Sequence, residues 1–213
     1  MKFSVTKNGE PLSPELYIWD EKTKTLSTAE SGLVLDFSGV NDCTITAGYG
    51  NTITAGDDNT ITACYGNTIT AGDGNTITAG DGNTITACDF NTITAGDGNT
   101  ITACYGNTIT AGYGNTITAG YGNKYNINGY DMPVPPIQYN GSRYPIGYHS
   151  PGVISSGCIT KPLTWWVENV RRCAEENKYT PEQIDEYEIY VELLALWMKK
   201  FGLDTEQKGE GKQ

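Results

Sequence analysis

The chain has 213 residues, of which 38% are hydrophobic and 26 are glycine, and Asp and Glu outnumber Lys and Arg by 25 to 14. This length allows one domain with an appendage, and the low apolar content argues against a large conventional core. The acidic balance argues against direct binding of nucleic acid or of an anionic membrane surface. It could attract a protein partner with a basic surface or imitate nucleic acid, and its plainer interpretation is that acidic residues keep a sheet-rich rod soluble.

The opening sequence MKFSVTKNGEPLS lacks the apolar region of a signal peptide, and no segment is apolar enough to span a membrane. We therefore expect a cytoplasmic protein whose six cysteines are thiols. None of the cysteines lies in a CxxC pair, which argues against a zinc site.

Residues 1–40 are predicted to form an N-terminal β cap. The pair Asn8-Gly9 is a turn signal, and the stretches LYIWDEKTKTLST and GLVLDFSG are strand-like. Leu35 and Phe37 continue the inward positions of the following repeats with larger side chains, so this segment can cover one end of a repeat structure.

Residues 41–123 repeat the octad N-T-I-T-A-G-[DY]-G, in which Thr-Ile-Thr occurs ten times. The alternation predicts a strand with Ile, Ala and Asn inward and both Thr outward, and Gly supplies the corner. Two octads make one coil, so the predicted fold is mainly β: a two-sided β-solenoid of about 16 residues per coil, with coils stacked at about 4.8 Å.

Residues sixteen positions apart are predicted to lie directly over one another. An inward Ile must match the Ile below it, because a narrow core tolerates neither a void nor a clash. Asn side chains can bond coil to coil in two ladders. These ladders contain Asn51, Asn67 and Asn83 on one side, and Asn59, Asn75 and Asn91 on the other. Cys88 and Cys104 are also stacked, and we expect the pair to be reduced.

The variable corner residues fall into two columns by the same arithmetic. One column reads Tyr49, Tyr65, Asp81, Asp97, Tyr113, and the other reads Asp57, Asp73, Asp89, Tyr105, Tyr121. Stacked tyrosines can form a ladder that mediates a homodimer. Stacked aspartates repel one another unless a cation or a basic partner lies between them. These ten residues are our first candidate binding site.

The C-terminal third is predicted to differ from the repeats. Residues 124–160 are rich in Pro, Tyr and Gly without periodicity, which indicates an extended wrap or linker. Residues 161–203 are predicted to form a helical hairpin, with Thr164 capping the first helix and Thr180 the second. Residues 204–213 are polar and are expected to form a disordered tail. The second helix has one apolar stripe, expected to serve packing: Ile184, Tyr187, Val191, Leu194, Ala195 and Met198.

The stretch TAGYGNTITAGDDNTITACYGNTITAG resembles the central repeats of bacterial ice-nucleation proteins. That resemblance covers about eighty residues and implies a β-solenoid with Thr-x-Thr rows. The whole chain also resembles uncharacterised phage and prophage repeat proteins, in the opening VTKNG with WDEKTKTLST and in the ending SGCITKPLTWWVENVRRCAEENKYTPEQIDEYEIYVELL. This second resemblance implies a phage or prophage origin, in the cytoplasm of a bacterial host, and brings no catalytic motif.

The sequence favours a non-enzymatic binding protein that docks on a host or viral protein, with partial nucleic-acid mimicry by the Asp columns as a sharper version. A catalytic site is not expected, because the only histidine is His149 in the Pro- and Gly-rich segment. No cofactor is expected. A calcium ladder is disfavoured, because the period is eight and Tyr replaces Asp in half the corners.

Two further surfaces are candidates. The alternative function is ice binding by an outward array of Thr-x-Thr pairs, and the plainer interpretation of this array is that Thr suits an exposed strand face. This array includes Thr68, Thr70, Thr84, Thr86, Thr100 and Thr102. The second surface is a candidate hot spot for a partner, if it is exposed, and consists of Trp165, Trp166 and Trp197. The alternative interpretation is that these tryptophans pack over the end of the solenoid.

Overall fold

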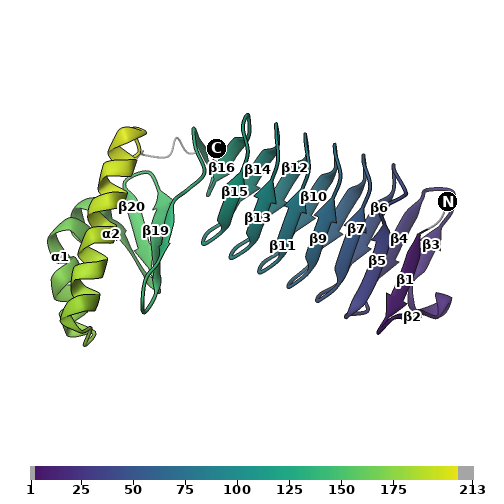
Figure 1. Ribbon diagram of the computed structural model, residues 1–213, viewed down its shortest axis with the longest axis horizontal. Helices are drawn as coiled ribbons and strands as arrows, with labels where there is room; N and C mark the ends of the chain where they lie inside the picture. The colour runs from purple at the N-terminus through teal and green to yellow at the C-terminus, as the bar shows by residue number, and fades with distance from the viewer. Residues whose placement is uncertain (1–2, 206–213) are drawn as a thin grey trace, which may run out of the picture. The chain divides into compact units, whose positions relative to one another are not determined.

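The structure is a computed structural model that describes residues 3–205. It divides into two compact units, Met1–Pro135 and Pro136–Gln213. The first unit is the solenoid (Figure 1), and the second is a small sheet with two helices. Each unit has its own core.

The solenoid is built from ten strands of identical sequence, Thr-Ile-Thr-Ala. They are β6 (Thr44–Ala47), β7 (Thr52–Ala55), β8 (Thr60–Ala63), β9 (Thr68–Ala71), β10 (Thr76–Ala79), β11 (Thr84–Ala87), β12 (Thr92–Ala95), β13 (Thr100–Ala103), β14 (Thr108–Ala111) and β15 (Thr116–Ala119). The β-branched residues favour the extended backbone, and each octad's Gly-containing corner ends the strand.

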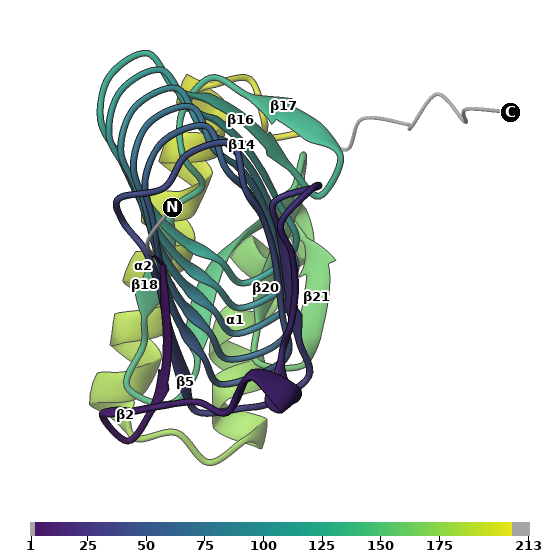
Figure 2. The same ribbon diagram turned by 90° about the vertical axis from the view of Figure 1, so that its right-hand side faces the viewer.

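Even- and odd-numbered strands of the repeat lie in two different parallel sheets, which face one another in the end-on view of Figure 2. Each strand pairs with the strand sixteen residues away and in perfect register, so that Ile77 lies between Ile61 and Ile93. This confirms the predicted two-sided solenoid with about 16 residues per coil.

The core of the solenoid consists of the Ile and Ala columns, flanked by two ladders of buried Asn. Ile85 is fully buried, and Asn83 is only 1% exposed. Asn83 Oδ1 accepts a hydrogen bond from the Asn67 N–H (2.7 Å), and its Nδ2 donates to the Cys64 carbonyl (2.9 Å). The predicted Asn ladders are therefore confirmed, with each amide satisfying backbone groups that the corner leaves unpaired.

The N-terminal cap continues both sheets and then reverses strand direction. Its elements are β1 (Ser4–Lys7), β2 (Glu10–Pro11), a 3₁₀ helix (Pro14–Leu16), β3 (Ile18–Asp20), β4 (Thr25–Thr28) and β5 (Leu33–Phe37). Strand β4 pairs in parallel with β6, and β5 pairs in parallel with β7. On their outer sides, β3 pairs antiparallel with β4, and β1 pairs antiparallel with β5. The antiparallel strands end the stack and so protect the edge from further pairing.

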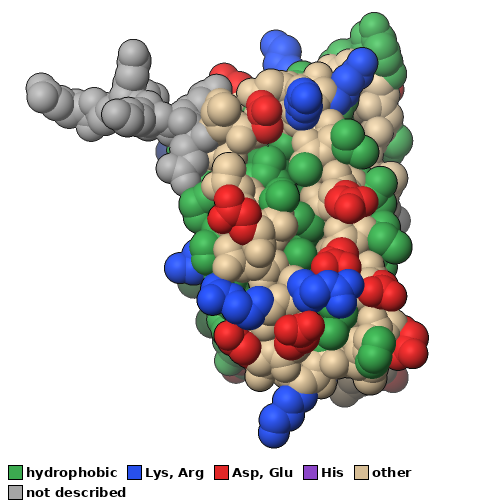
Figure 3. Space-filling model, turned by 90° about the vertical axis from the view of Figure 1, so that its left-hand side faces the viewer, with side chains coloured by type: hydrophobic (Ala, Val, Ile, Leu, Met, Phe, Trp, Pro, Cys, Tyr) green, Lys and Arg blue, Asp and Glu red, His purple; other side chains and the backbone are tan. Residues whose placement is uncertain are grey.

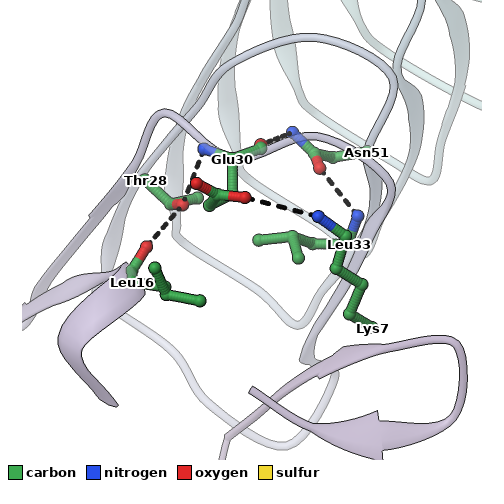
Figure 4. Close-up of polar contacts among 6 residues, drawn as sticks. All are labelled: Lys7, Leu16, Thr28, Glu30, Leu33 and Asn51. Atoms are coloured by element: carbon green, nitrogen blue, oxygen red, sulfur yellow. Dashed lines mark hydrogen bonds and ion pairs between the residues drawn. The ribbon is translucent and has the colours of Figure 1, made fainter. Parts of the chain in front are cut away.

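The first Asn ladder ends in the cap, as Figure 4 shows. Asn51 Oδ1 accepts from the Leu33 N–H (2.9 Å), and its Nδ2 donates to the Glu30 carbonyl (3.1 Å). The Glu30 carboxylate also pairs with Lys7 at 3.3 Å, and the Glu30 N–H donates to the Thr28 hydroxyl. The irregular cap thus supplies the groups that a further coil would otherwise provide.

The solenoid extends past the predicted boundary at residue 123. Strand β16 (Lys124–Ile127) pairs in parallel with β14, and β17 (Tyr130–Met132) then pairs antiparallel with β16. The sequence Lys124-Tyr125-Asn126-Ile127 keeps apolar residues at the inward positions of the octad but replaces all four residue types. The strand was therefore not recognised from the repeat. The Asn128-Gly129 turn, with φ of 52° and 84°, closes this hairpin.

The second unit contains an antiparallel sheet where an extended wrap was expected. Its strands are β18 (Gln138–Asn140), β19 (Pro145–Ser150), β20 (Val153–Ser156) and β21 (Ile159–Pro162), paired in that order. The strands have three to six residues and are interrupted by Gly and Pro, so no long alternation marks them in the sequence.

Two helices complete this unit, α1 (Leu163–Glu176) and α2 (Pro181–Lys200). The capping box of α2 is confirmed, because Thr180 Oγ1 accepts from the Gln183 N–H. The expected cap at Thr164 is wrong: β21 runs directly into α1, whose N-cap is Pro162 without a side-chain cap bond, and the Leu163 N–H donates to the Gly152 carbonyl (2.7 Å). The expected tail lies almost wholly outside the described residues.

The helical stripe is confirmed as packing. Ile184, Tyr187, Val191, Leu194 and Met198 are buried, while Ala195 is half-buried. On the outer helical face (Figure 3), hydrophobic side chains lie between charged side chains of both signs.

Candidate functional site

The outward threonines form one flat array on each sheet of the solenoid. On the odd-numbered strands, Thr68 pairs with Thr84 and Thr84 with Thr100, and Thr70, Thr86 and Thr102 form the adjacent row. All six of these side chains are exposed. Neighbouring strands lie about 4.8 Å apart, and the two rows lie about 7 Å apart along the strand. The structure therefore brings together all six residues of the predicted Thr face.

The second sheet carries an equivalent array. Thr76 pairs with Thr60 and Thr92, and Thr78 with Thr62 and Thr94. Every outward position of the ten repeat strands is Thr, and all are exposed except Thr44 and Thr54, which are half-buried near the cap. The result is two uniform surfaces of hydroxyl and methyl groups that carry no charge between the corners.

The corner aspartates do not simply face solvent, because each bonds to the next coil. Asp57 Oδ1 accepts from the Asp73 N–H (2.9 Å), Asp73 Oδ1 from the Asp89 N–H (2.9 Å), and Asp89 Oδ1 from the Tyr105 N–H (2.9 Å). In the other column, Asp81 bonds to the Asp97 N–H and Asp97 to the Tyr113 N–H, both at 2.8 Å.

These bonds give the corner aspartates a structural role that sequence reasoning missed. The predicted repulsion between stacked carboxylates is offset by a backbone N–H inserted into each step of the column. The recurrence of Asp at a spacing of sixteen was a signal for such a ladder, as it was for Asn. The acidity of the corners therefore does not by itself indicate a basic partner.

One corner of the solenoid carries a continuous aromatic stripe, in which Phe90, the residue after Asp89, joins Tyr105 and Tyr121 of the second column. The rings of Phe90 and Tyr105 lie 5.4 Å apart edge to face, and those of Tyr105 and Tyr121 lie 6.2 Å apart and stacked. Their exposed fractions are 63%, 46% and 85%. We call Phe90, Tyr105 and Tyr121 the aromatic stripe. Phe90 was not among the predicted site residues, because it replaces a glycine in the octad.

Phe90 adopts an unfavourable backbone conformation. Its φ is 57°, in the left-handed region where the repeat otherwise places glycine in most coils. A bulky residue there costs on the order of 1–2 kcal/mol. An exposed aromatic residue held in a strained position is a feature to be explained by function.

The tyrosines of the other column are arranged differently. Tyr49 and Tyr65 are exposed, and Tyr113 is half-buried. The Tyr65 ring lies against Gly82 of the next coil, 2.9 Å from where a Cβ would stand. Gly82, with φ of 63°, is therefore required both by the turn and by the ring below it.

The three helical tryptophans do not form one exposed cluster. Trp166 is 3% exposed, and its indole N–H donates to the Ile154 carbonyl at 2.9 Å. Trp165 packs edge to face on Trp166, and Trp197 packs on Tyr148 and Phe201. Since Trp165 and Trp197 are half-buried, the expected hot spot is largely a set of packing residues of the second unit.

The cysteines are thiols throughout the described residues, and Cys88 and Cys104 are both exposed on neighbouring coils. Burial and the neighbouring Cys104 raise the pKa of the Cys88 thiol. His149 contacts the adjacent Ser150 hydroxyl at 3.4 Å.

Across residues 3–205, no group of three or more His, Cys, Asp or Glu side chains is arranged to hold a metal ion. In the same residues, neither helix is long and apolar enough to cross a membrane. Comparison of the chain with protein-family profiles, with curated proteins and with solved structures returned no match.

Proposed function

We propose that the protein is a non-enzymatic binding protein whose two Thr arrays bind ordered water at an ice surface. The observation that carries the proposal is the uniformity of positions that packing does not constrain. Uniform Ile, Ala and Asn are explained by the buried core and ladders, but an exposed strand position also accepts other strand-forming residue types, such as Val and Tyr. Every outward repeat position is nevertheless Thr.

The corners show that the repeats have diverged where divergence is tolerated. Corner positions hold Asp, Tyr, Phe, Cys or Gly in different coils, whereas the Thr rows do not vary at all. A partner that requires the same group at every coil must itself be periodic. A lattice of ordered water meets this requirement better than the irregular surface of a folded protein, and it agrees with the resemblance to ice-nucleation repeats.

The test is ice-recrystallisation inhibition by the full chain and by two matched variants. Replacing Thr70, Thr86 and Thr102 by Lys adds long charged side chains to one array without changing the core, and we expect loss of most activity from that face. The same change at Thr62, Thr78 and Thr94 tests the other array. Circular dichroism confirms that each variant keeps its strands. An unmodified protein that leaves ice growth unchanged contradicts the proposal.

A second candidate function is docking on a protein of host or viral origin, consistent with a phage or prophage source. The specific observation in its favour is the strained, exposed Phe90 at the head of the aromatic stripe. Asp57, Asp73 and Asp89 continue the same corner column, so a partner with an apolar and a basic patch would match it. Exposed stacked rings also suit the homodimer predicted from the Tyr ladder.

Two variants separate these forms of docking. Replacing Phe90, Tyr105 and Tyr121 by Gly, Ser and Ser removes the stripe, and sedimentation then reports whether a dimer is lost. Replacing Asp57, Asp73 and Asp89 by Asn removes charge but keeps the Oδ1 acceptor, and so leaves the corner bonds in place. Binding of a basic partner that survives both changes excludes this corner as the docking surface.

A further inference from the structure

The second unit contains a cavity that none of the preceding functions uses. Its volume is about 140 Å³. Its walls come from α1 and the connection that follows it, from the turn between β20 and β21, from the segment before β19, and from Tyr187 of α2. The lining includes Trp166, Val170, Ala174, Ile159, Cys158 and Tyr179. All of these residues belong to Pro136–Gln213, so the cavity does not depend on the solenoid.

Hydrogen bonds to the backbone hold two of the side chains that line the cavity in place. The Tyr187 hydroxyl accepts from the Tyr144 N–H (2.6 Å) and donates to the Tyr144 carbonyl (2.6 Å). The Arg143 N–H contacts the same hydroxyl at 3.3 Å. Trp166 is fixed by its bond to the Ile154 carbonyl. Because these side chains are already positioned, a ligand would enter without paying to order them.

The walls are uncharged. No lining residue is Asp, Glu, Lys, Arg or His. Burial raises the pKa of Tyr179 to about 12 and also raises the pKa of Cys173, so both lining groups are neutral at physiological pH. A charged ligand would lose its hydration here without finding an ion partner among the lining residues, which is costly. The Arg143 guanidinium lies over the ring of Tyr179, at 4.8 Å from its centre, and is not part of the lining.

We propose that this cavity binds a small neutral ring compound, aromatic or alicyclic, with at most one polar substituent. The size supports this class, since an apolar cavity of about 150 Å³ in a well-studied protein binds benzene. Aromatic and aliphatic walls supply the contacts for the ring, and Ser156, Tyr179 and Asn177 are the lining groups that can serve one polar substituent.

The experiment is a titration of the full chain with phenol and with indole, followed by NMR chemical shifts and by the melting temperature. We expect saturable shifts confined to residues 136–205 and a rise in melting temperature. Benzoate, which matches phenol in size but carries a charge, should bind at least tenfold more weakly. Absence of saturable binding by both neutral probes at millimolar concentration overturns the proposal.

A matched pair of variants locates the ligand. Ala174→Leu fills the cavity, since Ala174 lines it and is 5% exposed, and it should abolish binding. Val167→Leu adds a methylene group to the same helix at a position that is 58% exposed and does not line the cavity, so it should leave binding unchanged. Binding that survives Ala174→Leu places the ligand elsewhere and overturns the proposal.

Thiol protection provides a readout that does not depend on the folding of a variant. Cys158 lines the cavity and is exposed, whereas Cys64 is exposed on the solenoid. Saturating indole should slow the alkylation of Cys158 by iodoacetamide several-fold and leave the rate at Cys64 unchanged. Equal rates with and without indole contradict binding in this cavity.

Discussion

The solenoid and the C-terminal unit build their buried cores in different ways. In the solenoid each coil repeats one set of contacts, so Ile lies on Ile and Asn bonds to Asn along the whole stack. In the C-terminal unit, single residues such as Trp166 and Tyr187 make contacts that occur once. Repetition spreads stability evenly over the coils, whereas a unique core concentrates it in a few side chains.

The difference also separates two kinds of surface. The repeated unit presents periodic faces and corners, which suit a periodic or extended partner. The unique unit encloses a cavity, which suits a small ligand.

Trp166→Ala should have the largest effect. The substitution empties the centre of the C-terminal unit and removes the bond to the Ile154 carbonyl, at a cost of about 3–5 kcal/mol. Hydrogen exchange followed by mass spectrometry should show lost protection in peptides from residues 136–205 and unchanged protection in the repeats. Equal loss in both units would show that the two do not have independent cores.

Asn83→Ala tests whether a local change in the solenoid destabilises only the neighbouring coils. The change removes the acceptor for the Asn67 N–H and the side-chain donor to the Cys64 and Asp81 carbonyls, at a residue that is 1% exposed. Leaving such groups unpaired costs about 1–3 kcal/mol. Exchange should accelerate in the coils on either side of residue 83 and much less at β5 and β16. A uniform change along the stack would contradict a nearest-neighbour description.

Alkaline pH should weaken the C-terminal unit through Tyr179. Burial raises its pKa from 10 to about 12, so the folded state holds this proton more tightly than the unfolded state does. Its contribution to stability is therefore complete below pH 10 and is lost as the pH rises toward 12. Tyr179→Phe should reduce the fall in melting temperature over this range. Tyr190, whose pKa is raised by the Glu186 carboxylate, should account for part of the remainder.

The contrast between the units explains what the sequence could and could not predict. The octad identified the strands, the inward Ile, the outward Thr and the Asn ladders, because periodicity reports directly which residues share a face. It did not reveal β16, where Tyr125 and Ile127 keep the pattern with different residues. The sheet from β18 to β21 was missed because short antiparallel strands depend on partners that local sequence does not name.

Part of the candidate site could likewise be predicted from the sequence, and part could not. The Thr arrays followed from alternation alone. The bond from each corner Asp to the next coil depends on a side-chain rotamer that no pattern specifies. The cavity also needed the structure, because it is formed by residues from four separate segments.

The smallest expected effect concerns the corner ladder, at Asp73. Its Oδ1 accepts from the Asp89 N–H at 2.9 Å in an exposed corner. Asp73→Ala should destabilise the adjoining coils by about 1 kcal/mol or less, because water can replace the lost bond. Asp73→Asn keeps an acceptor oxygen and removes the charge, so hydrogen exchange at the Asp89 amide should remain slow in this variant and become faster in the alanine variant. If the carboxylate charge were what this position requires, the two variants would be equally destabilised. If the acceptor is what matters, the asparagine variant retains the protection, and the acidity of this column is a consequence of how its corners are bonded.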